Sequence, residues 1–511
     1  MTNRFWQQHS MAILSLLLFF PILLLILYGY NGAQYKKLNL PPSPFKLPII
    51  GNLHQLGSLP HHSLRTLAEK YGPLMLIHFG SIPTLVVSTA EMAQEVLKTH
   101  DIDFASRPAF NAGNQLLYSC TDMALSPYGE YWRQVRKICV TELLSPKRVQ
   151  TIGFIREEEI AIMVKEIKAS CSISAVDLTE KFLTLSSSVV SRAALGKKYS
   201  EDDKGSSSFA ELARDLTILL GAFCVGDLFP GFGWLDVLTG LDGRLKRNNR
   251  GLDKFFEQVI KDHRNSKTKD ANDKHIDFVD ILLRVQREIT TGVQLSEDNI
   301  KATILDMFVA GTETTSATLE WTMTELITNP RTMVKAQEEV RRVIGRKMKV
   351  EEKDIVEMNY LKNVIKETLR LHPPAPLLIP HQSISSVTLQ GYFIPPKTRV
   401  YINAWAIGRD PKLWEKPNEF LPDRFTNSPI DLKGNDFQLI PFGSGRRICP
   451  GMTFASYTME FALANLLYWF DWEFPAGVTK ENLDLSEEIG MASHKKYPLL
   501  LVPKYHFSEA V

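Results

Sequence analysis

The sequence lacks the charge excess, the cysteine pairs and the repeats that mark several common protein classes. Its 59 Lys and Arg against 57 Asp and Glu leave a net charge of +2 over 511 residues, which argues against a nucleic-acid-binding protein. Only five cysteines in so long a chain exclude a disulfide-stapled secreted module, and their odd count without a C-x-x-C pair favours a reducing compartment. With 44% hydrophobic residues, the chain can instead fold around a large core.

At about 150 residues per domain, a chain of this length would be expected to have three domains, but no convincing linker divides it. Residues 200–208 and 261–275 are polar and poor in apolar side chains, so we expect surface loops there. The prediction is one large domain over residues 57–511.

An apolar run precedes this domain. Residues 11–28 carry no charge and would reach roughly 27 Å as a helix, close to a hydrocarbon core of about 30 Å. Lys36 and Lys37 outnumber Arg4, which orients the rest of the chain toward the cytosol. We expect a membrane anchor in residues 1–35 and a proline-rich hinge in residues 36–56; a cleaved signal peptide is the alternative.

The most informative stretch is residues 441–451, PFGSGRRICPG, followed by a run with apolar residues at helical spacing. Pro450 fits a first helical position, which places Cys449 near the N-cap, where free amides and the helix dipole favour a thiolate. The same loop supplies Gly443, Gly445 and Gly451, which let the backbone fold closely, Phe442, which can cover one face of a flat ligand, and Arg447, which can neutralise an anionic edge group.

The surroundings of Cys449 fit a packing, zinc or protease role less well. A lone cysteine is usually a small buried hydrophobe. The pattern F-x-x-G-x-R-x-C-x-G, however, arises by chance on the order of once in ten thousand chains of this composition. No second cysteine or histidine lies at zinc-ligand spacing, and a cysteine protease would not account for the arginine or the glycines.

This loop resembles the haem-binding loop of the cytochrome P-450 haem-thiolate monooxygenases, and the likeness is nearest to plant microsomal enzymes of specialised metabolism. The resemblance implies a mainly α fold with small β-sheets (α+β), one amino-terminal transmembrane helix, and heme b (iron protoporphyrin IX) bound through Cys449. Four further segments are similar to motifs of that family and extend the likeness over nearly the whole chain: residues 132–136 (W-x-x-x-R), 310–315 (the oxygen-binding groove), 367–370 (E-x-x-R) and 420–425 (P-x-R-F).

The oxygen-binding segment lies in a long predicted helix. Ser296 is an N-cap candidate followed by two acids, and Asn329-Pro330 is a stop, so we expect one helix of about 30 residues between them. By the resemblance, Ala310 and Gly311 leave room at the haem face, while Thr314 and Glu313 relay protons for dioxygen cleavage. Without the cysteine loop, an ordinary core helix with a surface glutamate would be the simpler interpretation.

The E-x-x-R pattern is weak alone, because Glu338 with Arg341 and Glu339 with Arg342 also match it and would be ordinary surface pairs. The resemblance singles out a buried structural network of Glu367, Arg370 and Arg424.

Further site residues follow from the resemblance. Trp132 and Arg136 are expected at the haem propionates, although a solvated helix face accounts for Arg136 equally well. His381 is expected there too, but it stands where many plant relatives carry arginine. The substrate pocket is expected within residues 104–124, 209–237, 306–313, 375–379 and 489–491, with Ala375, Leu377, Leu378, Ile379 and Ile489 as named lining residues, and a lipophilic terpenoid or phenolic as substrate.

No dinucleotide-binding fingerprint appears, so electrons must come from a separate carrier. The resemblance implies an NADPH-cytochrome reductase, with cytochrome b5 as a second partner, at the endoplasmic reticulum membrane. Arg133, Lys137 and Arg446 are candidates for that contact. A haem-thiolate isomerase or dehydratase, and a non-enzymatic haem protein, remain as alternative functions.

Overall fold

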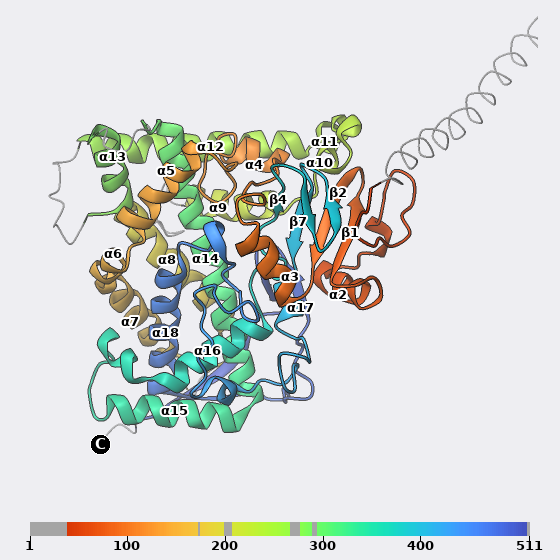
Figure 1. Cartoon of the computed structure of the whole chain (residues 1–511). Helices are drawn as coiled ribbons and strands as arrows, with labels where there is room; N and C mark the ends of the chain where they lie inside the picture. Colours follow the sequence, from red (N-terminus) through yellow and green to blue (C-terminus); the bar gives the residue numbers. More distant parts are fainter. Residues whose placement is uncertain (1–37, 172–173, 199–206, 266–275, 289–293, 508–511) are drawn as a thin grey trace, which may run out of the picture.

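The chain folds into a mainly helical body with small β-sheets, of which the four-stranded one lies at one side (Figure 1). This matches the predicted α+β class. The expected anchor, residues 1–35, lies outside the described part of the chain. The computed structural model describes residues 38–171, 174–198, 207–265, 276–288 and 294–507.

Helices make up most of the body, and their ends follow local signals. The helix α8, for example, begins behind Asp177, whose carboxylate accepts a hydrogen bond from Glu180 N, and ends at Gly196 with φ +74°. The α-helices are α2 (Pro60–Tyr71), α3 (Ala90–Gln94), α4 (Asn111–Leu116), α5 (Glu130–Ile138), α6 (Pro146–Thr151), α7 (Gly153–Ala169), α8 (Leu178–Leu195), α9 (Ser207–Leu220), α10 (Val225–Leu228), α11 (Trp234–Leu238), α12 (Leu241–Asn265), α13 (Phe278–Glu288), α14 (Glu297–Thr328), α15 (Pro330–Ile344), α16 (Asn359–Leu371), α17 (Ala404–Ile407) and α18 (Met452–Trp469).

The strands form short sheets. The largest has the order β1-β2-β7-β4, in which β2 and β7 are parallel and the other pairs are antiparallel. Others have the orders β3-β11-β8, β10-β9 and β5-β6. The strands are β1 (Leu74–Phe79), β2 (Ile82–Val87), β3 (Val176–Asp177), β4 (His381–Gln382), β5 (Val387–Leu389), β6 (Tyr392–Ile394), β7 (Arg399–Ile402), β8 (Phe470–Glu473), β9 (Glu487–Ile489), β10 (Ser493–Lys495) and β11 (Leu500–Tyr505).

The long helix α14 crosses the body beside α8, α16 and α18 (Figure 1). The predicted span is confirmed: Ser296 is the N-cap and forms a capping box with Asn299, and the helix ends at Thr328 before Asn329. Gly311 allows close packing, because a Cβ there would lie 2.9 Å from a methyl of Val190 on α8. A glycine that costs helix stability is therefore needed for the contact with α8.

The proline-rich segment lies against the four-stranded sheet. Leu76 N of β1 donates to Pro42 O at 2.9 Å, and the Asn52 amide donates to Phe45 O at 3.2 Å. Asn52 also accepts from His78 N at 2.8 Å. Proline has no N–H to donate, so Pro42 can pair with the neighbouring strand only through its carbonyl oxygen. The described part of the expected hinge, from residue 38 on, is thus docked on the body.

Two local expectations are wrong in part. Residues 261–265 belong to α12 and not to a loop, and the rest of that expected loop lies outside the described residues. The Glu339 carboxylate accepts hydrogen bonds from Tyr360 N and Leu361 N at the start of α16, while Arg341 pairs with Asp471 at 2.8 Å. These side chains serve neighbouring elements and not each other.

No single helix of the described ranges is long and apolar enough to cross a membrane. One pair, Glu211–Leu228 with Pro230–Leu238, passes the length and composition test together, with a bend of 105°.

A buried ion network joins α16 to the segment before the cysteine loop. Arg370 donates to both oxygens of Glu367, at 2.7 and 2.8 Å, and Arg424 Nε donates to Glu367 Oε1 at 3.0 Å. Arg370 also donates to the carbonyl oxygens of Gly408, Pro417 and Glu419. The structure thus brings together the three residues expected to form a network, and the buried Arg370 guanidinium has five acceptor atoms.

We expect Glu367→Gln to lower the free energy of unfolding by about 3–5 kcal/mol, because it leaves the buried Arg370 guanidinium without its counter-charge. Urea unfolding followed by tryptophan fluorescence measures the change. The matched control is Glu338→Gln on the exposed face of α15, where we expect less than about 0.5 kcal/mol. Equal effects of the two variants would contradict a stabilising role for the network.

Candidate active site

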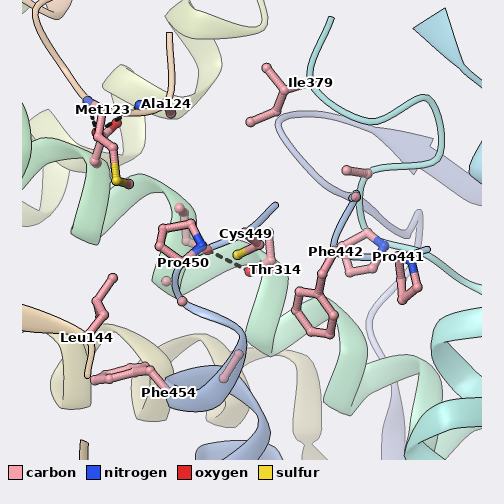
Figure 2. Close-up of a pocket in the computed structure, with 18 of the residues that line it drawn as sticks. Met123, Ala124, Leu144, Thr314, Ile379, Pro441, Phe442, Cys449, Pro450 and Phe454 are labelled. Carbon is pink, nitrogen blue, oxygen red and sulfur yellow. Dashed lines mark hydrogen bonds between the residues drawn. The ribbon is translucent and has the colours of Figure 1, made fainter. Parts of the chain in front are cut away.

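One cavity lies between α14 and residues 441–451, and it carries the candidate site (Figure 2). Its floor comes from the cysteine loop and the start of α18, and its opposite wall from the middle of α14. Residues 374–381 and the segment after α4 close the sides. Among the residues expected at the site, those that line it are Arg136, Ala310, Gly311, Thr314, Ala375, Leu378, Ile379, His381, Phe442, Gly443, Arg447, Cys449 and Gly451.

Cys449 presents a free thiol to this cavity. Burial raises the pKa of the Cys449 thiol, whereas hydrogen bonds from the amides of Gly451 and Met452 and the nearby Arg136 guanidinium lower it. The helix α18 begins at Met452 with Gly451 as N-cap, two residues later than expected, because Pro450 belongs to the preceding turn. The helix end alone therefore does not make this sulfur a thiolate, and a metal cation would be needed to complete the ionisation.

The glycines of the loop have different tasks. Gly443 and Gly445 have φ +72° and +66°, a conformation that other residues rarely adopt. A Cβ on Gly445 would lie 2.2 Å from Leu97 O, so this glycine lets the loop approach the helical turn that follows α3. Gly445 does not line the cavity. A Cβ on Gly451 would lie 3.8 Å from the Cys449 sulfur, an ordinary contact.

The wall opposite Cys449 is made of small and hydroxylated side chains. Ala310 is exposed to the cavity, and the Thr314 hydroxyl donates to Ala310 O at 2.6 Å. Figure 2 shows Thr314 from α14 and Cys449 from the loop within the same pocket. Because its only proton is directed at Ala310 O, the Thr314 oxygen can accept a hydrogen bond from the cavity. Glu313 is half-buried and is not among the residues that line the cavity.

Three arginines converge on one rim of the cavity. Arg447 donates to Ala105 O and Ser126 O, at 2.7 and 2.6 Å, and its guanidinium lies 4.0 Å from the Trp132 ring centroid. Arg136 donates to Ile448 O. Arg107, which the sequence did not single out, donates to Ile379 O and Pro380 O at 2.7 and 2.9 Å, and to Ala124 O.

These cations have no carboxylate within ion-pair distance in the described ranges of the chain. Burial, together with the other arginines, lowers the pKa of Arg447 to about 8, and burial lowers the pKa of Arg107 to about 9. Buried positive charge that is met only by carbonyl oxygens favours an anionic ligand.

His381 and Trp132 support the same rim. His381 is buried, and its Nδ1 lies 2.9 Å from Phe104 O. Burial, with Arg107 and Arg447 nearby, lowers the pKa of His381 well below its usual range, so the ring is neutral here. The Trp132 indole N–H donates to Met123 O at 3.0 Å; Trp132 lies behind the arginines and not at the cavity wall.

The residues present fit iron protoporphyrin IX. The ring needs a flat space with one metal ligand on one face, and Cys449 faces the small residues of α14 across this cavity. Its two propionates need cations at one edge, and Arg107, Arg136 and Arg447 supply more positive charge than the protein itself neutralises.

The remaining wall is apolar and shaped by one unusual residue. Leu378 has φ +53°, which is uncommon for a leucine, and its N–H donates to Ala375 O at 3.0 Å. This turn directs Ala375, Leu378 and Ile379 into the cavity, and Arg107 holds its end by hydrogen bonds to Ile379 O and Pro380 O. Leu377, by contrast, packs under the sheet with Tyr401, and Ile489 is 37% exposed; neither is among the described residues that line the cavity.

A buried acid pair at the cavity was also missed by the sequence analysis. Asp306 of α14 accepts from Met123 N and Ala124 N, at 2.7 and 3.2 Å, and its carboxyl is hydrogen-bonded to that of Asp122. Burial, and then the second carboxylate, raises the pKa of Asp306 well above its usual range. A shared proton therefore joins α14 to the segment that carries Met123. Only the tertiary contact shows this pair, because the two residues are far apart in the sequence.

Comparison with known proteins identifies the family. The sequence matches the model for Cytochrome P450 over residues 41–501. The chain belongs to the cytochrome P450 family. Its relatives include cytochrome P450 71A1 of Persea americana, 59% identical over 98% of this chain and 100% of that protein.

Two further relatives have names that state a reaction. Phenylacetaldehyde oxime monooxygenase of Prunus mume is 48% identical over 98% of both chains, and strychnine-11-hydroxylase of Strychnos nux-vomica is 48% identical over 91% of both chains. A zebrafish cytochrome P450 structure with progesterone aligns over 88% of this chain and 100% of its own, with a TM-score of 0.75 and 26% identity.

Membership of the cytochrome P450 family makes this protein a haem-containing monooxygenase that depends on O2 and NADPH. The alternatives without oxygen activation find no support among these relatives.

We expect Asp306→Asn to reduce the loss of stability at high pH. A raised carboxyl pKa in the folded state adds stability below the unfolded pKa, and this stability is lost as the pH rises through the folded value, by at most about 1.4 kcal/mol per pH unit. The amide oxygen can still accept from Met123 N and Ala124 N. Urea midpoints between pH 6 and 9 measure the slope. Asp298→Asn, at the exposed start of α14, is the control and should keep the wild-type slope.

Proposed function

We propose that this haem-thiolate enzyme oxygenates a lipophilic small molecule of plant specialised metabolism, a terpenoid or phenolic, with electrons that a separate reductase passes from NADPH. The observation that carries the proposal is a cavity in which a cysteine thiol faces a helix of small and hydroxylated residues, while most of the wall away from the arginine rim is apolar. Such a wall suits an apolar substrate held beside the reacting centre.

Cys449 is the proposed iron ligand. When bound, haem with a thiolate ligand supplies the chemistry that cleaves dioxygen and places one oxygen atom on a C–H bond. Arg107, Arg136 and Arg447 would bind the propionates, with Trp132 supporting the arginines and neutral His381 closing the same rim. Phe442, Gly443, Gly445 and Gly451 would shape the loop on the sulfur side, and Ala310 and Gly311 would leave space on the other side.

Thr314 and Glu313 are proposed to manage protons. The Thr314 hydroxyl proton is directed at Ala310 O, so Thr314 Oγ1 accepts a hydrogen bond from a water in the cavity and orients it. Glu313, half-buried next to it, would supply protons from the solvent side through water.

The substrate would lie against Ala375, Leu378 and Ile379, with Met123 and Met307 opposite. Relatives that act, by their names, on an oxime and on strychnine have the same family fold, so pocket shape decides the substrate. Leu377 and Ile489 would act only by supporting these segments.

A reductase, with cytochrome b5 as a second partner, would dock on the side of the cysteine loop. Arg446 is half-exposed in that loop and pairs with Asp101 at 3.1 Å, and Arg133 pairs with Glu130 on α5. With Lys137 they would present positive charge to an acidic partner.

The enzyme is proposed to sit on the endoplasmic reticulum membrane through residues 1–35, with its catalytic domain, residues 57–511, in the cytosol. Exposed apolar side chains support this orientation. Phe45 is 73% exposed after the proline segment, and Trp234 and Leu238 of α11 are 56% and 72% exposed. The turn between β1 and β2 joins these regions, because Gly80 N donates to Ile50 O at 3.2 Å and Ser81 N donates to Leu228 O at 3.0 Å. One apolar surface could therefore enter a bilayer interface.

The reaction is tested with membranes that contain the protein. Lipophilic metabolites are first screened for changes in the haem spectrum on binding. Product formation with the best ligand is then measured with and without reductase, NADPH and O2. We expect product only when all three are present; turnover without them would reject the proposal.

For Cys449→Ser we expect loss of the red-shifted Soret band of the reduced carbon monoxide complex, because an alcohol replaces the thiolate donor. Cys171→Ser, at a half-buried position away from the cavity, should keep the band and serves as control. An unchanged band in Cys449→Ser would show that another side chain holds the iron.

For Thr314→Ala we expect severalfold less product per NADPH consumed, with hydrogen peroxide released instead, because the oriented water is lost. The control is Thr322→Ala, which removes an equivalent hydroxyl bonded to Thr318 O two turns further along α14. Peroxide and product are measured in the same reaction. Full coupling in Thr314→Ala would place proton delivery elsewhere.

A further inference from the structure

A histidine cluster lies away from the cavity, where α2, β9 and the end of α16 meet. His61 and His62 stand at the start of α2, and Glu487 is the first residue of β9. His61 Nε2 lies 3.3 Å, and His62 Nε2 4.0 Å, from Glu487 Oε2. One ligand atom from each of the three residues falls within 4.8 Å of the others.

The imidazoles of this cluster are short of hydrogen-bond partners. Both ring nitrogens of His61, which is fully buried, and Nε2 of His62 are buried without a hydrogen bond. Unpaired buried polar groups cost about 1–3 kcal/mol each, so such atoms need a physical reason. A cation between the rings and the carboxylate would give a partner to Nε2 of both histidines, though not to His61 Nδ1.

We propose that His61, His62 and Glu487 bind one zinc ion. Two imidazoles and one carboxylate, with water in a fourth position, form a common zinc ligand set. Tetrahedral zinc bonds of about 2.0–2.1 Å put the ligand atoms about 3.4 Å apart, and the His61–Glu487 distance already has this value. His62, whose side chain is 44% exposed, needs only a small movement to close the set and leaves the ion a path from solvent.

His372 supports the site from outside. Its Nε2 lies 2.7 Å from Glu325 Oε1, and its Nδ1 lies 3.7 Å from Glu487 Oε1, which is too long for a hydrogen bond but places the ring beside the Glu487 oxygen that does not face the histidines. Such outer contacts orient metal ligands. The Trp321 ring stacks on His372 at 4.0 Å and fixes its plane.

Nearby charge limits which ion fits. Glu487 and Glu325 bring negative charge, whereas Arg409 and Arg65 lie beside the cluster against the Trp405 ring, at 4.2 and 5.6 Å from its centroid. Nitrogen donors and a near-neutral surrounding favour zinc over the oxygen-seeking ions Ca²⁺ and Mg²⁺. The ion would join α2 to β9, which is a structural role.

Zinc binding to the purified, chelator-treated, haem-loaded full chain tests the proposal. Equilibrium dialysis with ZnCl2, read as zinc and iron by mass spectrometry, should give one zinc per iron, and zinc-edge X-ray absorption should show two imidazoles among N/O ligands. We expect Glu487→Gln and His62→Ala to weaken binding at least tenfold, and His372→Gln by about tenfold.

If Glu487→Gln does not fold, His62→Ala still tests the proposal, because the His62 side chain is half exposed and its loss should be tolerated. The spectrum of the reduced carbon monoxide complex shows whether each variant is folded. His263→Gln, in a second cluster of histidine and carboxylates, is the control and should bind zinc as the wild type does. Zinc affinity that is unchanged in both Glu487→Gln and His62→Ala, or lost in His263→Gln alone, would overturn the proposal.

Discussion

A flat gap has to stay open between α14 and the cysteine loop, although protein interiors otherwise close to crystal-like density. Two sets of buried polar contacts keep it open from outside. Glu367 ties α16 to the segment before the loop, and Arg107 holds the carbonyl oxygens of residues 379 and 380. Gly311 and Gly445 then allow the surrounding elements to pack closely beside the gap.

The positive groups around the gap gather at one rim. The Asp122–Asp306 pair lies beside them, because Met123 accepts from Arg447 through its carbonyl oxygen and donates its N–H to Asp306. An anionic edge of a ligand is therefore stabilised at the rim that carries Arg107, Arg136 and Arg447. A ligand that is flat, apolar in its middle and acidic at one edge therefore has a single favourable orientation.

Features encoded by local spacing were predictable. The cysteine loop and α14 follow from glycine, proline and capping signals within a few residues. The Glu367 network was predicted only through the resemblance to a family, because the E-x-x-R pattern recurs elsewhere in the chain. Single residues whose role depends on tertiary contact were not: Arg107 and Asp122 have no distinctive neighbours in the sequence. The side on which Leu377 lies also could not be known, since no local signal announces the left-handed conformation of Leu378 next to it. The start of α18 was displaced because a proline is equally suited to the turn before a helix.

The threonines along α14 give this helix an uncommon freedom. Thr303, Thr314, Thr318, Thr322, Thr324 and Thr328 each donate a hydroxyl to a carbonyl one turn earlier. A carbonyl oxygen that accepts from both a backbone N–H and a threonine hydroxyl keeps the second hydrogen bond when the first one lengthens. The helix can therefore curve without leaving that carbonyl unsatisfied. Variation in curvature would then resize the chamber without any substitution in its lining, which offers a route by which closely similar linings come to admit differently shaped molecules.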